Sequence, residues 1–400
     1  MITFKEALDL VLVNTPILPA VLKNVHEIDS DVLTEDIKAK VDLPVSSNSA
    51  MDGYALCFED THSVPVVLRT KGCIKAGDFP RAIVGKGEAA KIMTGAPLPE
   101  GANAVVIVED TEEKEKTVIV KESVKKGENV RLKGEEIKKG QIALKKGTKL
   151  NPASLGFLAA MGWRKVRVFS KPKVSLLITG NELVKPGREL KPGKIWESNL
   201  TTLNAALDQI NIKPVFSGTA RDSLQDLEKK IQKGLETSDI LLISGGISVG
   251  DDDFVQELLL KQKVKKIFWR VAIKPGKPTF FGIKGKKLIF GLPGNPASVL
   301  VTFLEFVRPA ILKMTGQKDV LLHERKAILE EKLQKKVDRA YFLKGILQER
   351  NGRAYVKSAG LQDSHILESF GKANCLVFLE KEKNFFKKGE RVKIQILPWK

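Results

Sequence analysis

Cysteine and histidine are scarce in this 400-residue chain, and long apolar runs are missing. Cys57, Cys73 and Cys375 lie far apart and form no C-x-x-C pair, which excludes a disulfide framework and a cysteine-rich zinc site. Four scattered histidines argue against a transition-metal centre. Charged residues interrupt every apolar stretch before about 18 residues, so we expect no membrane span. The N-terminus lacks a signal-peptide pattern, and together these features predict a cytoplasmic protein.

Positive charge is what the chain has in excess. Lys and Arg number 67 against 48 Asp and Glu, which gives a formal net charge of +19. Such a balance suits a polyanionic partner or an anionic small molecule, but it is also compatible with a role in solubility alone. The apolar fraction of 42% and the charged fraction of 29% are those of an ordinary globular protein.

Composition and periodicity change along the chain and predict a multidomain α/β and β protein. Thr3 and Glu6 have capping-box spacing before an amphipathic helix, and Asn151 opens a second helix. We predict four domains: a helical linker domain (1–42 plus 145–172), an inserted β-rich domain (43–144), a parallel three-layer α/β domain (173–316) and a C-terminal β-barrel (317–400).

The third domain alternates strand and helix, which predicts a parallel sheet with right-handed crossovers. The expected strands are 174–179, 213–218, 239–246, 265–273 and 287–294, and the expected helices are 199–207, 223–235, 254–261 and 295–314. We expect Asn199 and Ser223 to cap two of these helices.

A glycine-rich segment follows the strand that ends near Ile243. Its Gly245, Gly246, Ser248 and Gly250 can bring backbone N–H groups close to an anion, and ligands of open α/β sheets bind at this edge. Three carboxylates follow at once, at 251–253. They either cap the next helix or hold a divalent cation against phosphate oxygens.

Two further strand ends carry oxyanion-binding chemistry. Lys274 and Lys277 flank a stiff Pro-Gly turn, which indicates an anion site rather than a pair of solvated lysines. The residues Pro293, Gly294, Asn295, Pro296 and, after Ala297, Ser298 lead a strand into a helix, whose N-terminus is suited to an anion. A purely structural tight turn is the competing interpretation.

Better-known motifs are matched poorly. Gly246-x-Ser248-x-Gly250 has the form of a nucleophile elbow, but the helix does not begin at the serine, and His323 and His365 lie beyond the α/β stretch. A serine hydrolase is therefore a remote alternative. The P-loop and the dinucleotide fingerprint are absent.

The motifs taken together resemble the MoeA family, the molybdopterin molybdenumtransferases, which are similar to the E domain of gephyrin. N-S-A-M-D-G-Y-A (48–55), I-M-T-G-A-P (92–97) and R-L-K-G-E-E-I (131–137) look like its inserted domain. T-G-N-E-L (179–183), 244–250, 274–278 and P-G-N-P (293–296) resemble its molybdopterin-binding domain, and 360–364 with 373–375 its last β-domain.

The resemblance implies a homodimer whose active cleft joins the molybdopterin-binding domain of one subunit to the inserted and last domains of the other. It implies that the substrates are adenylylated molybdopterin and molybdate, that Mg²⁺ is the cofactor, and that AMP is released as molybdenum enters the dithiolene. A molybdopterin adenylyltransferase is an expected partner. The sequence does not separate molybdate from tungstate.

The resemblance also assigns roles to individual residues. The implied catalytic positions are Asp52, Thr94, Glu136, Glu182, Asp222 and Asp253, of which Asp222, Asp253 and Glu182 are the expected metal ligands. Ser298, Arg339 and Ser364 match positions implied to contact molybdate. The chain departs from the family's usual residues at Asn181 and Glu136, and Lys344 replaces a frequent arginine and loses its bidentate geometry.

A non-catalytic scaffold, or a relative that binds nucleic acid, is the alternative from another functional class. No basic groove interleaved with aromatic residues and no nucleic-acid-binding module is recognisable. The carboxylates Asp52, Glu182, Asp222 and Asp253 favour an enzyme, since a scaffold does not need them.

Overall fold

The computed structural model describes residues 1–81, 83–220, 223–247 and 254–399. Two units follow from the contacts within the chain. One comprises Leu22–Ile28 and Glu35–Val166, and the other comprises Met1–Val21, Asp29–Thr34 and Arg167–Lys400. The predicted division into four domains stays a prediction. Among the described residues, no helix has the length and apolar character needed to cross a bilayer.

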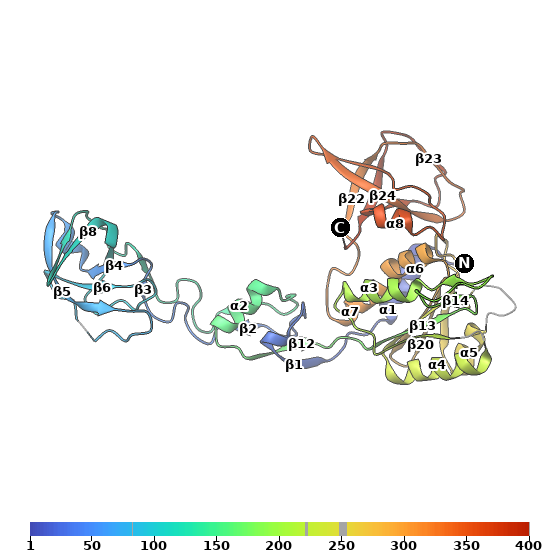
Figure 1. The fold of residues 1–400 in the computed structure, drawn as a ribbon, viewed down its shortest axis with the longest axis horizontal. Coiled ribbons are helices and arrows are strands. Elements are labelled where there is room, and N and C mark those ends of the chain that lie inside the picture. Colours follow the sequence, from blue (N-terminus) through green and yellow to red (C-terminus); the bar gives the residue numbers. More distant parts are fainter. Residues whose placement is uncertain (82, 221–222, 248–253, 400) are drawn as a thin grey trace. The chain divides into compact units, whose positions relative to one another are not determined.

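The unit around residues 35–166 is built on a six-stranded sheet of order β7-β4-β6-β5-β9-β8 (Figure 1). Its strands are β4 (Gly53–Leu56), β5 (Val66–Ile74), β6 (Glu88–Ile92), β7 (Ala104–Ile107), β8 (Thr111–Lys114) and β9 (Thr117–Val120). Helix α2 (Pro152–Ala160) begins after Asn151, whose side chain accepts a 2.8 Å hydrogen bond from the Ser154 N–H. The predicted β-rich character and this helix start are confirmed.

The other unit contains the α/β sheet, of order β16-β13-β17-β21-β20-β18. Its strands are β13 (Val174–Thr179), β16 (Phe216–Ala220), β17 (Ile240–Ser244), β18 (Lys265–Trp269), β20 (Phe280–Lys284) and β21 (Lys287–Leu292). The first four in spatial order are parallel, as predicted. Strand β20 was not predicted, and it runs antiparallel to both β21 and β18, so the sheet is mixed.

Helices cover both faces of this sheet (Figure 1). The helices α1 (Phe4–Asn14), α3 (Asn199–Asp208), α6 (Pro296–Thr302) and α7 (Arg308–Met314) share one core, and α4 (Leu224–Thr237) and α5 (Val255–Lys261) lie in the other. Strand β13 supplies both cores because successive side chains point to opposite faces: Leu176 enters one and Leu177 the other. The capping box of Thr3 and Glu6 is formed.

The predicted helix 295–314 is interrupted in its middle. A π-helical turn, Phe303–Val307, separates α6 from α7. Pro309 explains the break, because it has no N–H to donate to the carbonyl of Glu305 and its ring would clash with that carbonyl. The sequence prediction overlooked this proline.

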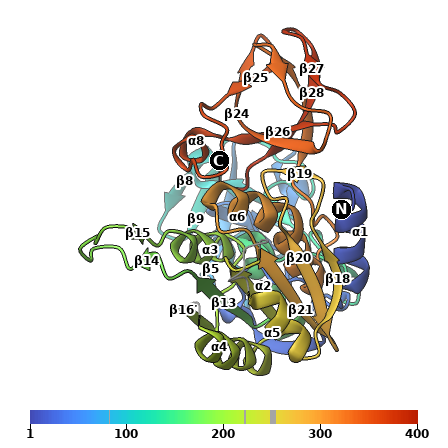
Figure 2. The same ribbon diagram turned by 90° about the vertical axis from the view of Figure 1, so that its right-hand side faces the viewer.

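The C-terminal part of the same unit is a closed five-stranded barrel, which confirms the predicted class (Figure 2). Its strands are β22 (Glu324–Leu329), β24 (Ala340–Arg350), β25 (Arg353–Ser358), β26 (Cys375–Leu379) and β28 (Arg391–Ile396). Pairing of β24 with β26 closes the ring. The short strand β19 (Ile273–Lys274) leaves the α/β region and adds to β24 in parallel, so the two parts share backbone hydrogen bonding.

A buried polar cluster also joins the π-helical turn to the barrel. Glu305 and Gln395 are each 4% exposed, and Gln395 Nε2 donates to Glu305 Oε2 at 3.3 Å. Glu305 Oε1 and Arg308 Nε have no hydrogen-bond partner among the described residues. Burial raises the pKa of Glu305 to about 8, with Glu324 adding to the rise and Arg308 opposing it.

Comparison with the Glu305→Gln variant should show how this buried carboxyl makes stability depend on pH. As the pH rises from about 4.5 to 8, the unfolded chain loses the proton before the folded chain does. The free energy of unfolding of the native protein should therefore fall by about 1.4 kcal/mol per pH unit in that window, relative to the variant. Urea unfolding from pH 4 to 9 measures the difference.

Glu382→Gln, at an exposed position of the barrel, is the control and should follow the native protein at every pH. A constant difference between native protein and Glu305→Gln across the window would contradict the assignment.

Candidate active site

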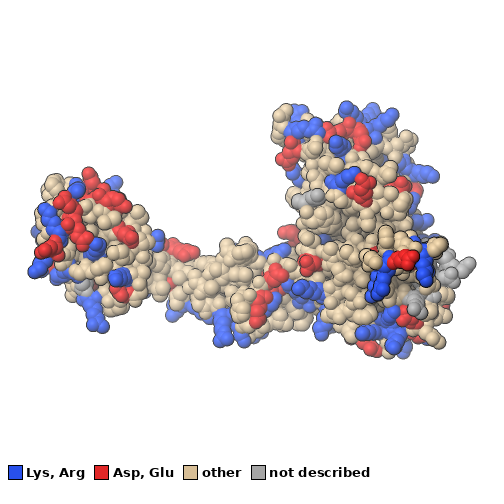
Figure 3. All heavy atoms as spheres, in the orientation of Figure 1, with Lys and Arg blue, Asp and Glu red and all other residues tan. Residues whose placement is uncertain are grey.

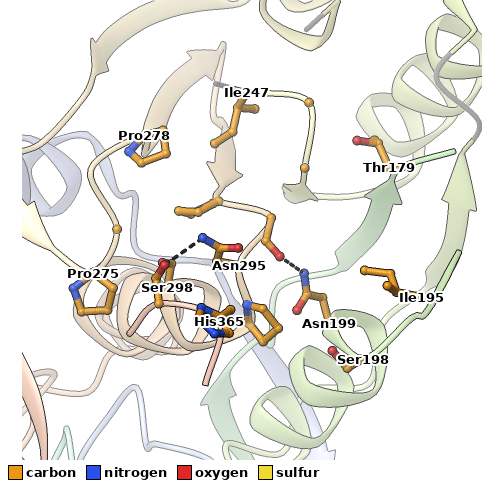
Figure 4. A pocket seen from close by; sticks show the side chains of 18 of the residues that line it. Thr179, Ile195, Ser198, Asn199, Ile247, Pro275, Pro278, Asn295, Ser298 and His365 are labelled. Atoms are coloured by element: carbon orange, nitrogen blue, oxygen red, sulfur yellow. Dashed lines mark hydrogen bonds between the residues drawn. The ribbon is translucent and has the colours of Figure 1, made fainter. Parts of the chain in front are cut away.

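A cavity of about 860 Å³ opens at the carboxyl edge of the parallel strands. The predicted residues that line it are Glu182, Gly245, Gly246, Lys274, Lys277, Pro293, Gly294, Asn295, Pro296, Ser298, Arg339 and Ser364. The α/β region and the barrel both contribute (Figure 4). The structure thus brings together segments up to about 180 residues apart in sequence, as expected when parallel strands end at one edge.

Glycine is required where two of the loops meet. Gly245 has a φ of +91°, and a Cβ atom there would lie 2.5 Å from the carbonyl oxygen of Thr179. Gly246 has a φ of +62°, and a Cβ there would lie 2.8 Å from Val255 Cγ2. The loop after β17 therefore packs directly on the end of β13. The hydroxyl of Thr179, which lines the cavity, is buried without a partner among the described residues.

Asn199 joins the loops rather than capping a helix, which corrects the prediction. It is the first residue of α3, and its Nδ2 donates to Gly294 O at 2.7 Å and to Ser244 Oγ at 3.2 Å (Figure 4). Ser244 Oγ in turn donates to Pro293 O at 2.9 Å. The cap is supplied by Glu197, whose Oε1 accepts from the Leu200 N–H at 2.7 Å. Ser223 does cap α4, as predicted.

The basic turn is fixed by the backbone around it. Pairing of β19 with β24 places Lys274 beside Tyr341, with Nζ 5.2 Å from the ring centroid. The Lys277 carbonyl accepts from the N–H groups of Val271 and Thr279, both at 3.0 Å. Neither lysine forms an ion pair with a carboxylate in the described part of the chain, so both charges are available to an anion.

The start of α6 offers fewer N–H groups than we predicted. Pro296 has none, and the Ala297 N–H donates to the backbone carbonyl of Ser364 at 3.0 Å. Hydroxyl groups are available instead. Ser298 lines the cavity, and its Oγ makes no hydrogen bond within the described residues, while Ser364 Oγ accepts from Asn295 Nδ2 at 2.8 Å (Figure 4).

Two buried lysines of the barrel hold the loops that reach the cavity. Lys335 Nζ donates to the Arg339 carbonyl at 3.1 Å. Lys344, 1% exposed, donates to the carbonyls of Asp363 and Ile366 at 3.2 and 3.3 Å. Burial lowers the pKa of both amines. Lys344 does not line the cavity, and it lies instead beneath the loop that carries Ser364.

Three predicted residues belong to the other unit. Asp52 Oδ1 accepts from the Thr94 N–H at 2.6 Å and from Thr94 Oγ1 at 2.8 Å, and these bonds lower the pKa of Asp52. Glu136 is exposed. The structure therefore pairs Asp52 with Thr94, and the predicted participation of all three in catalysis stays a prediction.

Four predicted residues, Ser248, Gly250, Asp222 and Asp253, lie outside the described residues. Of the expected metal ligands, only Glu182 lies within the described residues, where it is an exposed carboxylate that lines the cavity. No group of three or more potential metal-ligating side chains occurs within 1–81, 83–220, 223–247 and 254–399.

Several residues that line the cavity are not among the individually predicted site residues. These are Thr179, Trp196, Glu197, Asn199 in its joining role, Ile247 and His365. For Trp196, Glu197 and Asn199 the sequence signal is the segment I-W-E-S-N before a helix, where a carboxylate and an amide lie close to a tryptophan.

The surface charges are mixed. On the face that Figure 3 shows, basic side chains are interspersed with acidic ones rather than gathered in one groove.

Gly245→Ala should destabilise the protein more than a glycine replacement at an open position. It combines a left-handed φ with a clash against the Thr179 carbonyl, whereas Gly193→Ala, at φ +77°, meets no atom within 4 Å. We expect Gly245→Ala to lower the free energy of unfolding by roughly 2 kcal/mol more than Gly193→Ala. Equal losses for the two variants in urea unfolding would show that the loop is not closely packed.

Comparison with known families agrees with this arrangement. Residues 2–162 match the MoeA N-terminal region (domain I and II), residues 175–313 match a probable molybdopterin binding domain, and residues 326–397 match the MoeA C-terminal region (domain IV).

Relatives and solved structures match over nearly the whole chain. A molybdopterin molybdenumtransferase of Haemophilus influenzae is 36% identical over 376 residues, which cover 93% of this chain and 92% of the relative. One from Nostoc sp. is 35% identical over 379 residues, covering 92% and 86%. The crystal structure of a molybdopterin biosynthesis MoeA protein from Pyrococcus horikoshii OT3 matches with a TM-score of 0.80 and 31% identity over 99% of this chain and 100% of that one. The resemblance inferred from the motifs is confirmed, and the chain belongs to the MoeA family.

Proposed function

We propose that this chain is a molybdopterin molybdenumtransferase, which inserts molybdate into adenylylated molybdopterin and releases AMP during molybdenum cofactor biosynthesis. The names of its relatives support the transferase activity. The observation that carries the proposal is the cavity, where Lys274 and Lys277 have no ion-pair partner among the described residues and lie with Ser298 on one lining surface.

Both reactants suit this chemistry. Molybdate and a phosphoanhydride are oxyanions, and each needs cationic groups and hydrogen-bond donors at fixed positions. The two ammonium groups supply charge, the Ser298 hydroxyl supplies a donor, and the guanidinium of Arg339 adds a planar donor. The proline-rich turns on both sides keep these groups oriented before the substrate binds.

Replacing each lysine tests whether the turn binds molybdate. Lys274→Ala and Lys277→Ala should each raise the molybdate concentration at half-maximal rate by about 10- to 150-fold, since a charge-assisted hydrogen bond contributes roughly 1.5–3 kcal/mol. The assay combines enzyme, adenylylated molybdopterin, Mg²⁺ and varied molybdate, and measures AMP and molybdenum cofactor.

Lys286→Ala removes an exposed lysine in the turn between β20 and β21 and is the control, with unchanged half-saturation. An unchanged molybdate dependence in both turn variants would mean that the turn is structural.

The Mg²⁺ requirement is part of the proposal. When bound, Mg²⁺ would neutralise charge on the pyrophosphate group of the substrate, and Asp222, Asp253 and Glu182 are the proposed ligands. The hard carboxylate oxygens of Glu182, exposed at the cavity, are compatible with this cation.

Glu182→Gln should reduce AMP release at low Mg²⁺, recover part of it at high Mg²⁺ and leave the melting temperature unchanged, because the side chain is exposed. Glu189→Gln is the control and should behave like the native protein, because Glu189 is also an exposed carboxylate but does not line the cavity. If Glu182→Gln turns over normally at low Mg²⁺, Glu182 is not a ligand.

We also propose a homodimer in which the Asp52–Thr94 pair of one subunit completes the cavity of the other. A mixture of two variants tests this, assayed at a molybdate concentration too low for Lys274→Ala alone to turn over measurably. Asp52→Ala and Lys274→Ala subunits, mixed and allowed to exchange, should recover about a quarter of the native activity, because half of the dimers carry one intact site out of two. No recovery after confirmed exchange would place the whole site in one subunit.

A further inference from the structure

The cavity has a second wall that differs from the basic turn. It is formed by residues 195–199, and Figure 4 shows Ile195, Ser198 and Asn199 on the side away from Pro275 and Ser298. This wall contains no cationic side chain, so it offers a different kind of recognition from the lysine turn.

Trp196 gives the wall a flat aromatic surface. It lines the cavity, yet 53% of the residue is exposed. Its orientation is fixed nevertheless, because β15 (Ile195–Trp196) pairs with β14 (Leu183–Val184) and the indole Nε1 donates to the Arg188 carbonyl at 2.9 Å. A fixed and uncovered indole face is suited to stacking with a planar ligand.

Glu197 places an acceptor next to that surface. It is 5% exposed and lines the cavity. One oxygen accepts from the Leu200 N–H, and the other has no hydrogen-bond partner within the described residues. The carboxylate also forms no ion pair there. Because the residue is 5% exposed and lines the cavity, this second oxygen is open to a donor from a ligand or from water in the cavity.

We propose that residues 196–197 bind the pterin ring of the substrate, with Trp196 stacked on the ring and Glu197 accepting hydrogen bonds from its amino group and adjacent ring N–H. This inference rests on the proposed function and deepens it. The phosphate groups of the same molecule then extend toward Lys274 and Lys277 across the cavity.

The substrate has a second planar ring, the adenine of its adenylyl group. The pterin edge offers two neighbouring donors, which a carboxylate accepts together. Adenine offers one amino group beside a ring nitrogen that is itself an acceptor, and that nitrogen would repel Glu197. The carboxylate therefore selects the pterin.

Binding of two probes tests the inference by calorimetry: pterin, which lacks phosphate, and AMP. In Trp196→Ala and Glu197→Gln, the dissociation constant of pterin should rise about tenfold or more, and that of AMP should change less than about twofold. Glu197→Gln keeps an oxygen for the Leu200 N–H, so its melting temperature should match that of the native protein. Trp399→Phe, distant from this wall in sequence and absent from the cavity lining, is the control.

With the full reaction, both variants should raise the KM for adenylylated molybdopterin and leave the half-saturation by molybdate unchanged. The inference is overturned if pterin affinity is unchanged, if AMP affinity falls instead, or if Trp196→Ala only dissociates a dimer, which would make the indole a subunit contact. If the native protein binds pterin through these residues but transfers no molybdenum, the proposed function fails, whereas the pterin-binding role of Trp196 and Glu197 is supported. If the native protein is active and the variants bind pterin normally, only this inference fails.

Discussion

The amide of Asn199 is the interaction on which the geometry of the cavity depends. Its Nδ2 joins the ends of β17 and β21 through Ser244 Oγ and Gly294 O. The parallel register of β13, β17 and β21 brings these ends to one edge. Gly245 lets the loop after β17 approach the carbonyl of Thr179 closely. A hydrogen-bonded network that is buried in this way is rigid, because each lost bond would leave an unpaired polar group.

The C-terminal barrel region supplies the remaining residues that line the cavity, among them Arg339 and Ser364. Addition of β19 to β24 fixes Lys274 against the barrel, and Arg339 directly precedes β24. Lys335 and Lys344 are buried and donate to the carbonyls of the loops that bear Arg339 and Ser364. In each case an ammonium group removed from water is satisfied by backbone oxygens, and these bonds hold the loop in place.

The buried strands, the glycine loop and the lysine turn could be predicted from sequence, because continuous apolar runs and Gly-Pro punctuation have local physical causes. The antiparallel strand β20 could not, since Gly282 interrupts its apolar run and its direction is set by pairing with β21. The role of Asn199 was missed for a similar reason. At the start of a helix, Asn is typical of a cap, and only the tertiary structure shows that its amide bonds to residues 45 and 95 positions away.

The role of Lys344 also depends on the tertiary structure. The resemblance to the family identifies Lys344 only as the replacement of a frequent arginine, whereas burial and two backbone acceptors give it a supporting position under the 363–366 loop. Residue identity alone does not distinguish a side chain that contacts a ligand from one that holds the contacting loop.

Anomalous diffraction from crystals soaked in molybdate would test the central claim most directly, namely that the cavity at the carboxyl edge of the sheet is the oxyanion site. We expect a molybdenum peak inside the cavity, with oxyanion oxygens within hydrogen-bonding distance of Lys274, Lys277 and Ser298. A molybdenum peak at another position, with the cavity empty at saturating molybdate, would contradict it.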